Sequence, residues 1–207
     1  MILTPFYEWQ KKFMKNFMLN AFDGEPKVYT INQCAGSGRT TLLNTLAVCL
    51  FQSFQSRLIR SGDKILMVSD TKEKQEYDKQ EIIKYYQYIE KAEDSVANEW
   101  REKYNSSHPK DSLQAGYTQL QNKFFNFITF HDLSQKVKIK KDLLSDFKYI
   151  FFDNSDRYNT EYLKGMINEA VYGPSYRLGS TYNELNKNGP KIILLSNVQD
   201  SKTGFSF

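Results

Sequence analysis

Five short, almost continuously apolar runs alternate along this chain with segments of helical periodicity. The runs begin at residues 27, 65, 125, 149 and 191, and they are rich in β-branched and aromatic residues. Strands that are apolar on both sides are typical of a parallel sheet whose two faces are covered by helices. We therefore expect an α/β fold with a mostly parallel sheet and helices on both faces. One domain should span residues 1–207, with a helical insertion at about 73–124.

The helices expected between these runs follow from apolar spacing and from turn residues. A first helix is predicted over residues 4–22, and a long apolar helix over 39–59. A charged helical stretch is predicted over 72–105 and a short basic one over 133–144. The last helix is expected at 161–172, before an irregular loop at 173–190 that is rich in Gly, Asn and Pro.

The charge, the cysteines and the lengths of the apolar runs limit the class of protein to which this chain can belong. With 28 Lys and Arg against 24 Asp and Glu, the chain is mildly basic, which permits nucleic acid as a partner but does not demand it. Cys34 and Cys49 have neither CxxC spacing nor histidine companions, so we expect no disulfide and no zinc site. No apolar run approaches the ~18 residues of a membrane span. A cytoplasmic, reducing location is therefore expected, and a viral origin is compatible with it.

A glycine-rich segment, AGSGRTT, joins the first predicted strand to the next helix. Glycines at such a junction let backbone N–H groups turn toward an anion at a helix N-terminus. Against the pattern G-x-x-x-x-G-K-[ST], Gln33 replaces the first glycine and Arg39 the lysine, whereas Gly38 and Thr40 match. A glycine-rich turn without a ligand is the alternative reading. The candidate phosphate-binding residues are Gln33, Ala35, Gly36, Ser37, Gly38, Arg39, Thr40 and Thr41.

Together with this loop, four further segments resemble the first RecA-like domain (1A) of UvrD/Rep-type superfamily 1 helicases. The loop resembles that family's AGSGKT, and the segment from Ile65, ILMVSDTKEKQ, is similar to its ILVLTFTNKAA. The segment ITFHDLSQKV, from Ile128, resembles TFHSL, and YIFFDNSDR, from Tyr149, resembles the strand that ends in DEAQD. The final segment, KIILLSNVQDSKTGFSF, resembles GDPDQSIYGFRG. The resemblance covers nearly the whole chain and implies a RecA-like P-loop fold.

The resemblance also implies ligands and roles for particular residues. ATP and Mg²⁺ would be the cofactors, with Thr40 and Asp153 on the metal and Gln10 reading adenine. Gln199 lies one position before the γ-phosphate-sensing glutamine, whose own place is taken by Asp200. Single-stranded nucleic acid would lie against Thr71, His131 and Phe205.

Several departures from the family pattern point to weakened catalysis. Asn154 occupies the position of the catalytic glutamate, and an amide cannot accept a proton. Losing a general base typically lowers a rate by ~10²–10⁴. Arg39 keeps a positive charge but is broader than lysine. Asp156, three residues after Asp153, is a substitute candidate for the base, and a solvated residue at a helix start is the alternative. The catalytic candidates are thus Asp153, Arg39 and Asp156, with impaired hydrolysis expected.

The predicted nucleic-acid contacts have structural alternatives. His131 is better explained as a hydrogen-bonded structural histidine than as a catalyst. Phe205 is explained either as an aromatic that stacks on bases or as a core aromatic. Asp70 replaces an aromatic residue of the family and would repel a phosphate backbone. The basic run at 136–141 is explained either by phosphate contact or by a solvated helix face.

Three hypotheses of function remain at this point. The first is a helicase-like domain that binds ATP and single-stranded nucleic acid, and that needs a second RecA-like domain or a protein partner to complete its cleft. The second is the ATPase domain of a viral DNA-packaging (large terminase) protein, against which the AGSG loop argues. The third is a catalytically dead pseudo-ATPase that serves as an interaction module.

Overall fold

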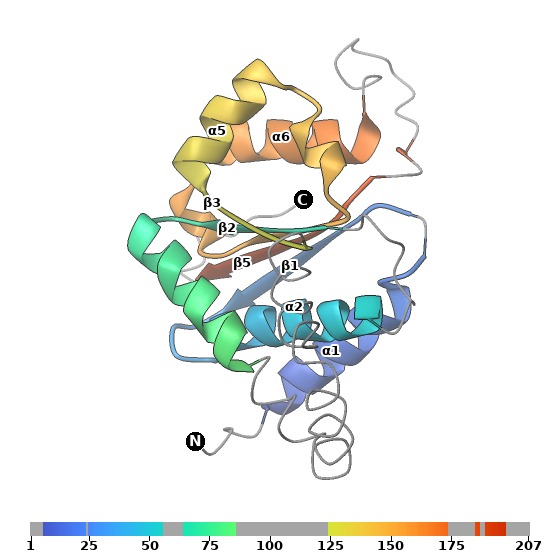
Figure 1. Ribbon diagram of the computed structural model, residues 1–207, viewed down its shortest axis with the longest axis vertical. Coiled ribbons are helices and arrows are strands. Elements are labelled where there is room, and N and C mark those ends of the chain that lie inside the picture. Colours follow the sequence, from blue (N-terminus) through green and yellow to red (C-terminus); the bar gives the residue numbers. More distant parts are fainter. Residues whose placement is uncertain are drawn as a thin grey trace, which may run out of the picture.

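The computed structural model describes residues 6–23, 25–55, 64–85, 124–173, 185–186 and 189–197. These residues contain one five-stranded sheet in the order β1-β5-β4-β2-β3, and every neighbouring pair of strands is parallel (Figure 1). The strands are β1 (Lys27–Gln33), β2 (Ile65–Ser69), β3 (Phe125–Thr129), β4 (Tyr149–Phe152) and β5 (Lys191–Asn197).

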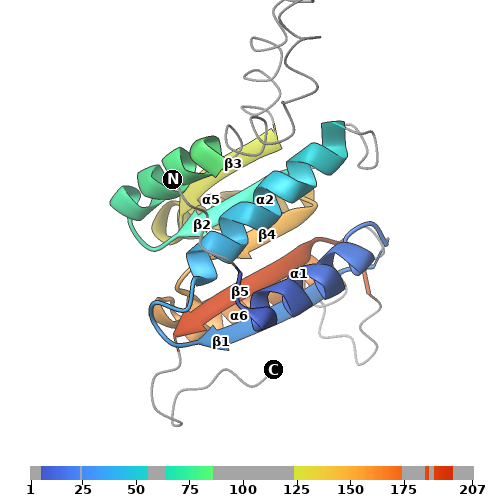
Figure 2. The same cartoon turned by 90° about the horizontal axis from the view of Figure 1, so that it is seen from below.

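Helices cover both faces of this sheet. The helices are α1 (Glu8–Asn20), α2 (Arg39–Gln55), α5 (Phe130–Ile139) and α6 (Thr160–Tyr172), and residues 72–85 form a further helix, called here helix 72–85. Figure 1 shows α5 and α6 on one face, and Figure 2 looks onto the other face, which α1, α2 and helix 72–85 cover. The predicted α/β fold, a mostly parallel sheet with helices on both faces, is confirmed. In the described part of the chain, no helix is both long and apolar enough to cross a bilayer.

The two faces hold two separate apolar cores, because successive residues of a strand point to opposite sides. On β4, Phe151 packs into the core under α1 and α2, whereas Ile150 and Phe152 pack into the core under α5 and α6. All three side chains are fully buried. This double burial is the reason that the strands read as continuous apolar runs.

Two short 3₁₀ helices change the boundaries expected from the sequence. The basic helix begins earlier than predicted, because the Thr129 hydroxyl accepts a hydrogen bond from the Asp132 N–H and caps α5. It ends at Ile139, because Lys140 is extended, and η1 (Leu143–Asp146) follows. A second 3₁₀ helix, η2 (Ser155–Arg157), follows β4. Most of the predicted insertion at 73–124 lies outside the described residues.

Parallel pairing brings the carboxyl ends of all five strands to one edge of the sheet. The glycine loop follows β1, Asp153 follows β4, and Asn197 ends β5, which lies between those two strands. Ligands of open α/β sheets bind at this edge. The candidate site is therefore assembled from segments that are far apart in the sequence.

Candidate functional site

The loop between β1 and α2 depends on two glycines. Gly36 has φ 77° and Gly38 has φ 79°, a left-handed backbone conformation that is unfavourable for residues other than glycine. At Gly38 a Cβ atom would also lie 2.6 Å from Nε2 of Gln10. The Leu42 N–H donates to the Gly38 carbonyl at 3.0 Å, so the loop leads directly into the first turn of α2.

The side chain of Gln10 links the start of α1 to this loop through hydrogen bonds. Its side chain is buried, its Oε1 accepts a hydrogen bond from the Tyr7 N–H at 2.8 Å, and its Nε2 donates to the Gly38 carbonyl at 2.9 Å. The structure therefore places Gln10 against the glycine loop, where the resemblance puts a nucleotide contact. Its amide also has a structural role, since it completes a capping box with Tyr7.

Two buried polar atoms of the loop have no hydrogen-bond partner within the described residues. They are Oγ of Ser37 and Nη1 of Arg39. The second terminal nitrogen of the guanidinium group, Nη2 of Arg39, donates to Oδ1 of Asn197 at the end of β5. Buried donors in native proteins are nearly always paired, so these two atoms point to a missing acceptor group. An anion at the N-terminus of α2 would supply it.

Asp153 lies beside this loop and is 3% exposed. Its Oδ2 accepts a hydrogen bond from the Thr40 hydroxyl at 3.2 Å, so the two predicted metal ligands are in contact. The same oxygen is 2.8 Å from the Lys74 ammonium, which reaches it from helix 72–85. The site thus contains a cation that was not among the predicted residues.

Lys74 forms a second ion pair with the buried Asp78, whose Oδ2 accepts a hydrogen bond from the Ser69 hydroxyl at 3.0 Å. Burial alone would lower the pKa of Lys74, but Asp153 and Asp78 outweigh it and raise that pKa above its usual value. Burial raises the pKa of the Asp78 carboxyl more than its ion pair with Lys74 lowers it. Lys74 therefore stays protonated at neutral pH.

A buried tyrosine holds the backbone of Asp153 in place. The Tyr158 hydroxyl donates to the Asp153 carbonyl, at 2.5 Å, and lies 3.3 Å from the Val68 carbonyl. Burial raises the pKa of Tyr158, so the hydroxyl remains a donor. Its ring stacks on Phe130, with centroids 4.1 Å apart and planes 6° apart. The end of β4 is thereby tied to β2 and to α5.

The residue in the position of the catalytic glutamate has an unusual backbone. Asn154 is left-handed, with φ 51° and ψ 45°, a conformation that asparagine tolerates better than most residues. Asp156 accepts hydrogen bonds from the Asn197 N–H at 3.0 Å and from its Nδ2 at 3.3 Å. Asp156 therefore joins η2 to the end of β5, a structural role that the reading as a catalytic base did not include.

Two of the three predicted nucleic-acid residues, Thr71 and His131, lie at the same edge of the sheet. Thr71 follows β2 and His131 follows β3, and these two strands are paired through Ser69 and Thr129. The Thr71 hydroxyl accepts a hydrogen bond from the Lys74 N–H and begins helix 72–85, whereas His131 is exposed. Phe205, Gln199 and Asp200 lie outside the described residues.

Two charge pairs modify the expectations for this edge. Asp70 is paired with Arg157 of η2 at 2.6 Å, so the negative charge that was expected to repel phosphate is locally compensated. In the basic run, Lys140 pairs with Asp146 at 2.5 Å. Lys136 and Lys138 lie in the last turn of α5, where positive charge also favours the helix dipole.

The sequence offered one signal for the missed cation. Lys74 stands where the resembled pattern ILVLTFTNKAA has alanine. Its partner Asp78 follows four residues later, which is the ordinary spacing of a surface ion pair on a helix. The contact with Asp153 depends on the pairing of β2 with β4 and is not visible in the sequence.

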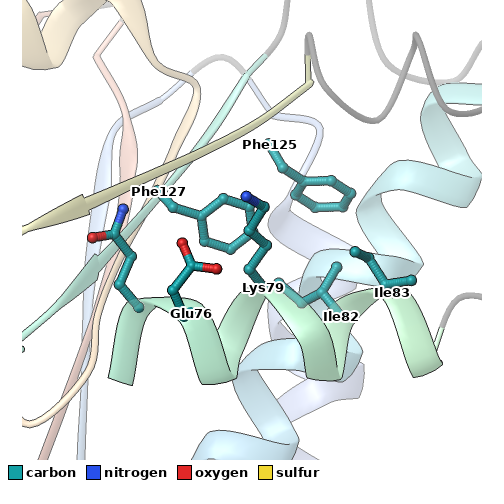
Figure 3. A pocket seen from close by; sticks show the side chains of 7 residues that line it. Glu76, Lys79, Ile82, Ile83, Phe125 and Phe127 are labelled. Atoms are coloured by element: carbon teal, nitrogen blue, oxygen red, sulfur yellow. The ribbon is translucent and has the colours of Figure 1, made fainter. Parts of the chain in front are cut away.

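A separate cavity of about 260 Å³ lies between helix 72–85 and the edge strand β3 (Figure 3). Phe125, Phe127, Ile82 and Ile83 supply its apolar wall. Gln75, Glu76 and Lys79 supply the polar side chains around it. None of the predicted site residues lines this cavity, and it carries no functional assignment.

Comparison with known proteins adds little beyond the fold. No family model and no curated protein matches this chain. Among solved structures, the crystal structure of a hypothetical ATP-dependent RNA helicase from Sulfolobus tokodaii is similar, with 17% sequence identity and a TM-score of 0.43. The match covers 95% of this chain and 47% of that chain, so this chain spans about half of that helicase.

Proposed function

We propose that this domain binds ATP through the loop at residues 35–41 and hydrolyses it poorly. The observation that carries this proposal is the pair of unsatisfied buried atoms, Oγ of Ser37 and Nη1 of Arg39, in a loop with two left-handed glycines. Phosphate oxygens would accept hydrogen bonds from both side chains and from backbone N–H groups at the start of α2. The residues of the loop therefore fit a polyphosphate.

The residues fit a magnesium ion less well. In the resembled family, Thr40 and Asp153 would face the metal, and their side chains are in contact here. However, Oδ2 of Asp153 is already paired with the Lys74 ammonium. Mg²⁺ requires near-octahedral oxygen ligands at about 2.0–2.1 Å, and an ammonium on the same oxygen opposes this.

Poor hydrolysis follows from the groups around Asp153. The amide of Asn154 cannot activate water, and Asp156 is engaged by Asn197. An arginine supplied by a second RecA-like domain or by a protein partner typically contributes ~10³–10⁵ in rate to related reactions. We propose that such a partner completes the cleft.

Single-stranded nucleic acid is the second proposed ligand. Thr71 and His131 lie at the carboxyl edge of β2 and β3, beside the proposed nucleotide site. Among the described residues of this edge, Lys74 and Arg157 are already paired with carboxylates, so we expect weak, salt-sensitive binding that is not specific for sequence.

The catalytically dead interaction module remains a second candidate function, favoured by one observation. Arg39, Asn197 and Asp156 form a continuous hydrogen-bonded chain that joins the glycine loop to β5 and η2. In this view the loop serves only to maintain the fold, and the domain acts by binding a protein partner through its surface. The two candidates differ in whether ATP binds at all.

ATP titration with thermal unfolding and calorimetry tests the proposal. A ligand present at 100 times its Kd stabilises the folded state by about 2.7 kcal/mol. Arg39→Met should weaken the response, because it removes the unsatisfied donor, whereas Lys79→Met, on an exposed residue of helix 72–85, should not. An unchanged unfolding temperature and no heat at millimolar ATP would favour the interaction module.

A further inference from the structure

The Lys74 ammonium contacts the Asp153 carboxylate, which also accepts a hydrogen bond from the Thr40 hydroxyl. Oδ2 of Asp153 is 2.8 Å from the ammonium and 3.2 Å from the Thr40 hydroxyl. The Lys74 side chain is 20% exposed and that of Asp153 is 4% exposed. The ammonium is therefore a fixed charge beside the first turn of α2, unlike a mobile lysine on the surface.

Asp78 holds this ammonium from the other side. The Asp78 side chain is 2% exposed, pairs with Lys74 and accepts the Ser69 hydroxyl. An ammonium has three hydrogens, and the two carboxylates use two of them, which leaves one for a further acceptor. Withdrawal of Lys74 would leave two buried carboxylates without a counter-charge, a strongly unfavourable arrangement. The ammonium is thus held in place by both of its partners.

A divalent metal held between Thr40 and Asp153 would lie on Oδ2, the oxygen that Lys74 already contacts, because Oδ1 accepts a hydrogen bond from the Asn154 N–H at 3.0 Å. Two cations on one carboxylate oxygen repel each other, and the low local dielectric strengthens this repulsion. Phosphates that enter beside Thr40 would meet a positive charge supplied by the chain itself. The same carboxylate pair would repel them if Lys74 were neutral or absent.

We propose that Lys74 is the built-in counter-cation of this site, so that the domain binds ATP without a divalent metal. The inference rests on the nucleotide binding proposed above and assigns to a side chain the role that Mg²⁺ has in the resembled helicases. The dissociation constants for ATP in excess EDTA and in excess magnesium should differ by less than about threefold.

The test is calorimetric titration of the full chain with ATP in these two buffers. The variants are Lys74→Met, the double variant Lys74→Met with Asp78→Asn, and Lys79→Met as a control cation on the same helix. The double variant removes one of the two buried carboxylates that Lys74→Met leaves unpaired, and the amide oxygen at position 78 can still accept a hydrogen bond from Ser69. Thermal unfolding checks that each variant is folded.

Wild type and Lys79→Met are expected to bind equally in both buffers. The double variant should lose about tenfold or more in EDTA and recover in magnesium, because the metal then replaces the lost ammonium. Wild-type binding that requires magnesium would overturn the inference and leave the proposed function standing. Absence of wild-type binding in both buffers would overturn both. A double variant that binds like wild type in EDTA would also refute the role of Lys74. If no variant folds, the wild-type comparison decides.

Discussion

Alanine at each of the two loop glycines should destabilise the protein to different degrees. Gly36 and Gly38 have nearly the same φ, 77° and 79°, so the left-handed strain of an added side chain is matched. The surroundings differ: a Cβ at Gly36 meets nothing within 4 Å, whereas one at Gly38 lies 2.6 Å from Nε2 of Gln10. The pair therefore separates backbone strain from the contact with Gln10.

The magnitudes follow from these geometries. A left-handed alanine costs about 1–2 kcal/mol, partly offset by about 0.4–1 kcal/mol because alanine restricts the unfolded chain. Gly36→Ala should therefore lower the free energy of unfolding by roughly 1 kcal/mol. Gly38→Ala should lower it by about 1–2 kcal/mol more, because it displaces the buried amide of Gln10 from the Gly38 carbonyl. The Gln10 amide can rotate away from the added Cβ, so the extra destabilisation comes mainly from its lost hydrogen bonds.

Urea denaturation of both glycine variants, in wild-type and Gln10→Ala backgrounds, measures the difference. In the Gln10→Ala background, the gap between the two alanine variants should shrink below about 0.5 kcal/mol, which is the usual limit of additivity. Equal destabilisation by the two alanines in the wild-type background would refute the proposed link between Gln10 and the loop. A gap that persists without the Gln10 side chain would refute it as well.

Three further predictions concern stability, catalysis and binding. Asp23→Asn should lower the free energy of unfolding by about 1–2 kcal/mol, less than for a fully buried ion pair, because Asp23 is 37% exposed and the buried Lys191 ammonium keeps its hydrogen bond to the Glu25 carbonyl. Lys191→Met should cost less in the same urea titration, and equal losses would contradict this. Phosphate release by the wild-type chain should be negligible, and the double variant Asn154→Glu with Arg39→Lys should not restore it. The left-handed backbone at position 154 disfavours glutamate, and no arginine is present to neutralise the charge that develops in the transition state. Wild-type turnover near one per second that vanishes in Asp153→Ala would instead show an active ATPase. Fluorescence anisotropy should detect weak binding of single strands that declines as salt increases, and equal or tighter binding of duplex would count against the proposed ligand.

The fold was largely predictable because its strands carry a local signal. Residues 191–197 were expected as a strand from their apolar run, and β5 has these bounds in the structure. The start of α5 was missed because it depends on a cap, the hydrogen bond from the Asp132 N–H to the Thr129 hydroxyl. Thr129 also belongs to the apolar run of β3, and its strand-like composition concealed its capping role.

The site was only partly predictable, because its decisive contacts join elements that are distant in the sequence. A motif locates Asp153 at the end of a strand, but it does not say which group neutralises the carboxylate. Lys74 and Asp78 alone would predict an ordinary exposed pair on a helix, worth about 0.3–0.5 kcal/mol. The pairing of β2 with β4 makes Lys74 part of a buried cluster with two carboxylates. A motif that departs from the resembled pattern is therefore better judged with its neighbouring strands, because these strands bring groups from other segments, such as the Lys74 ammonium, against its carboxylate.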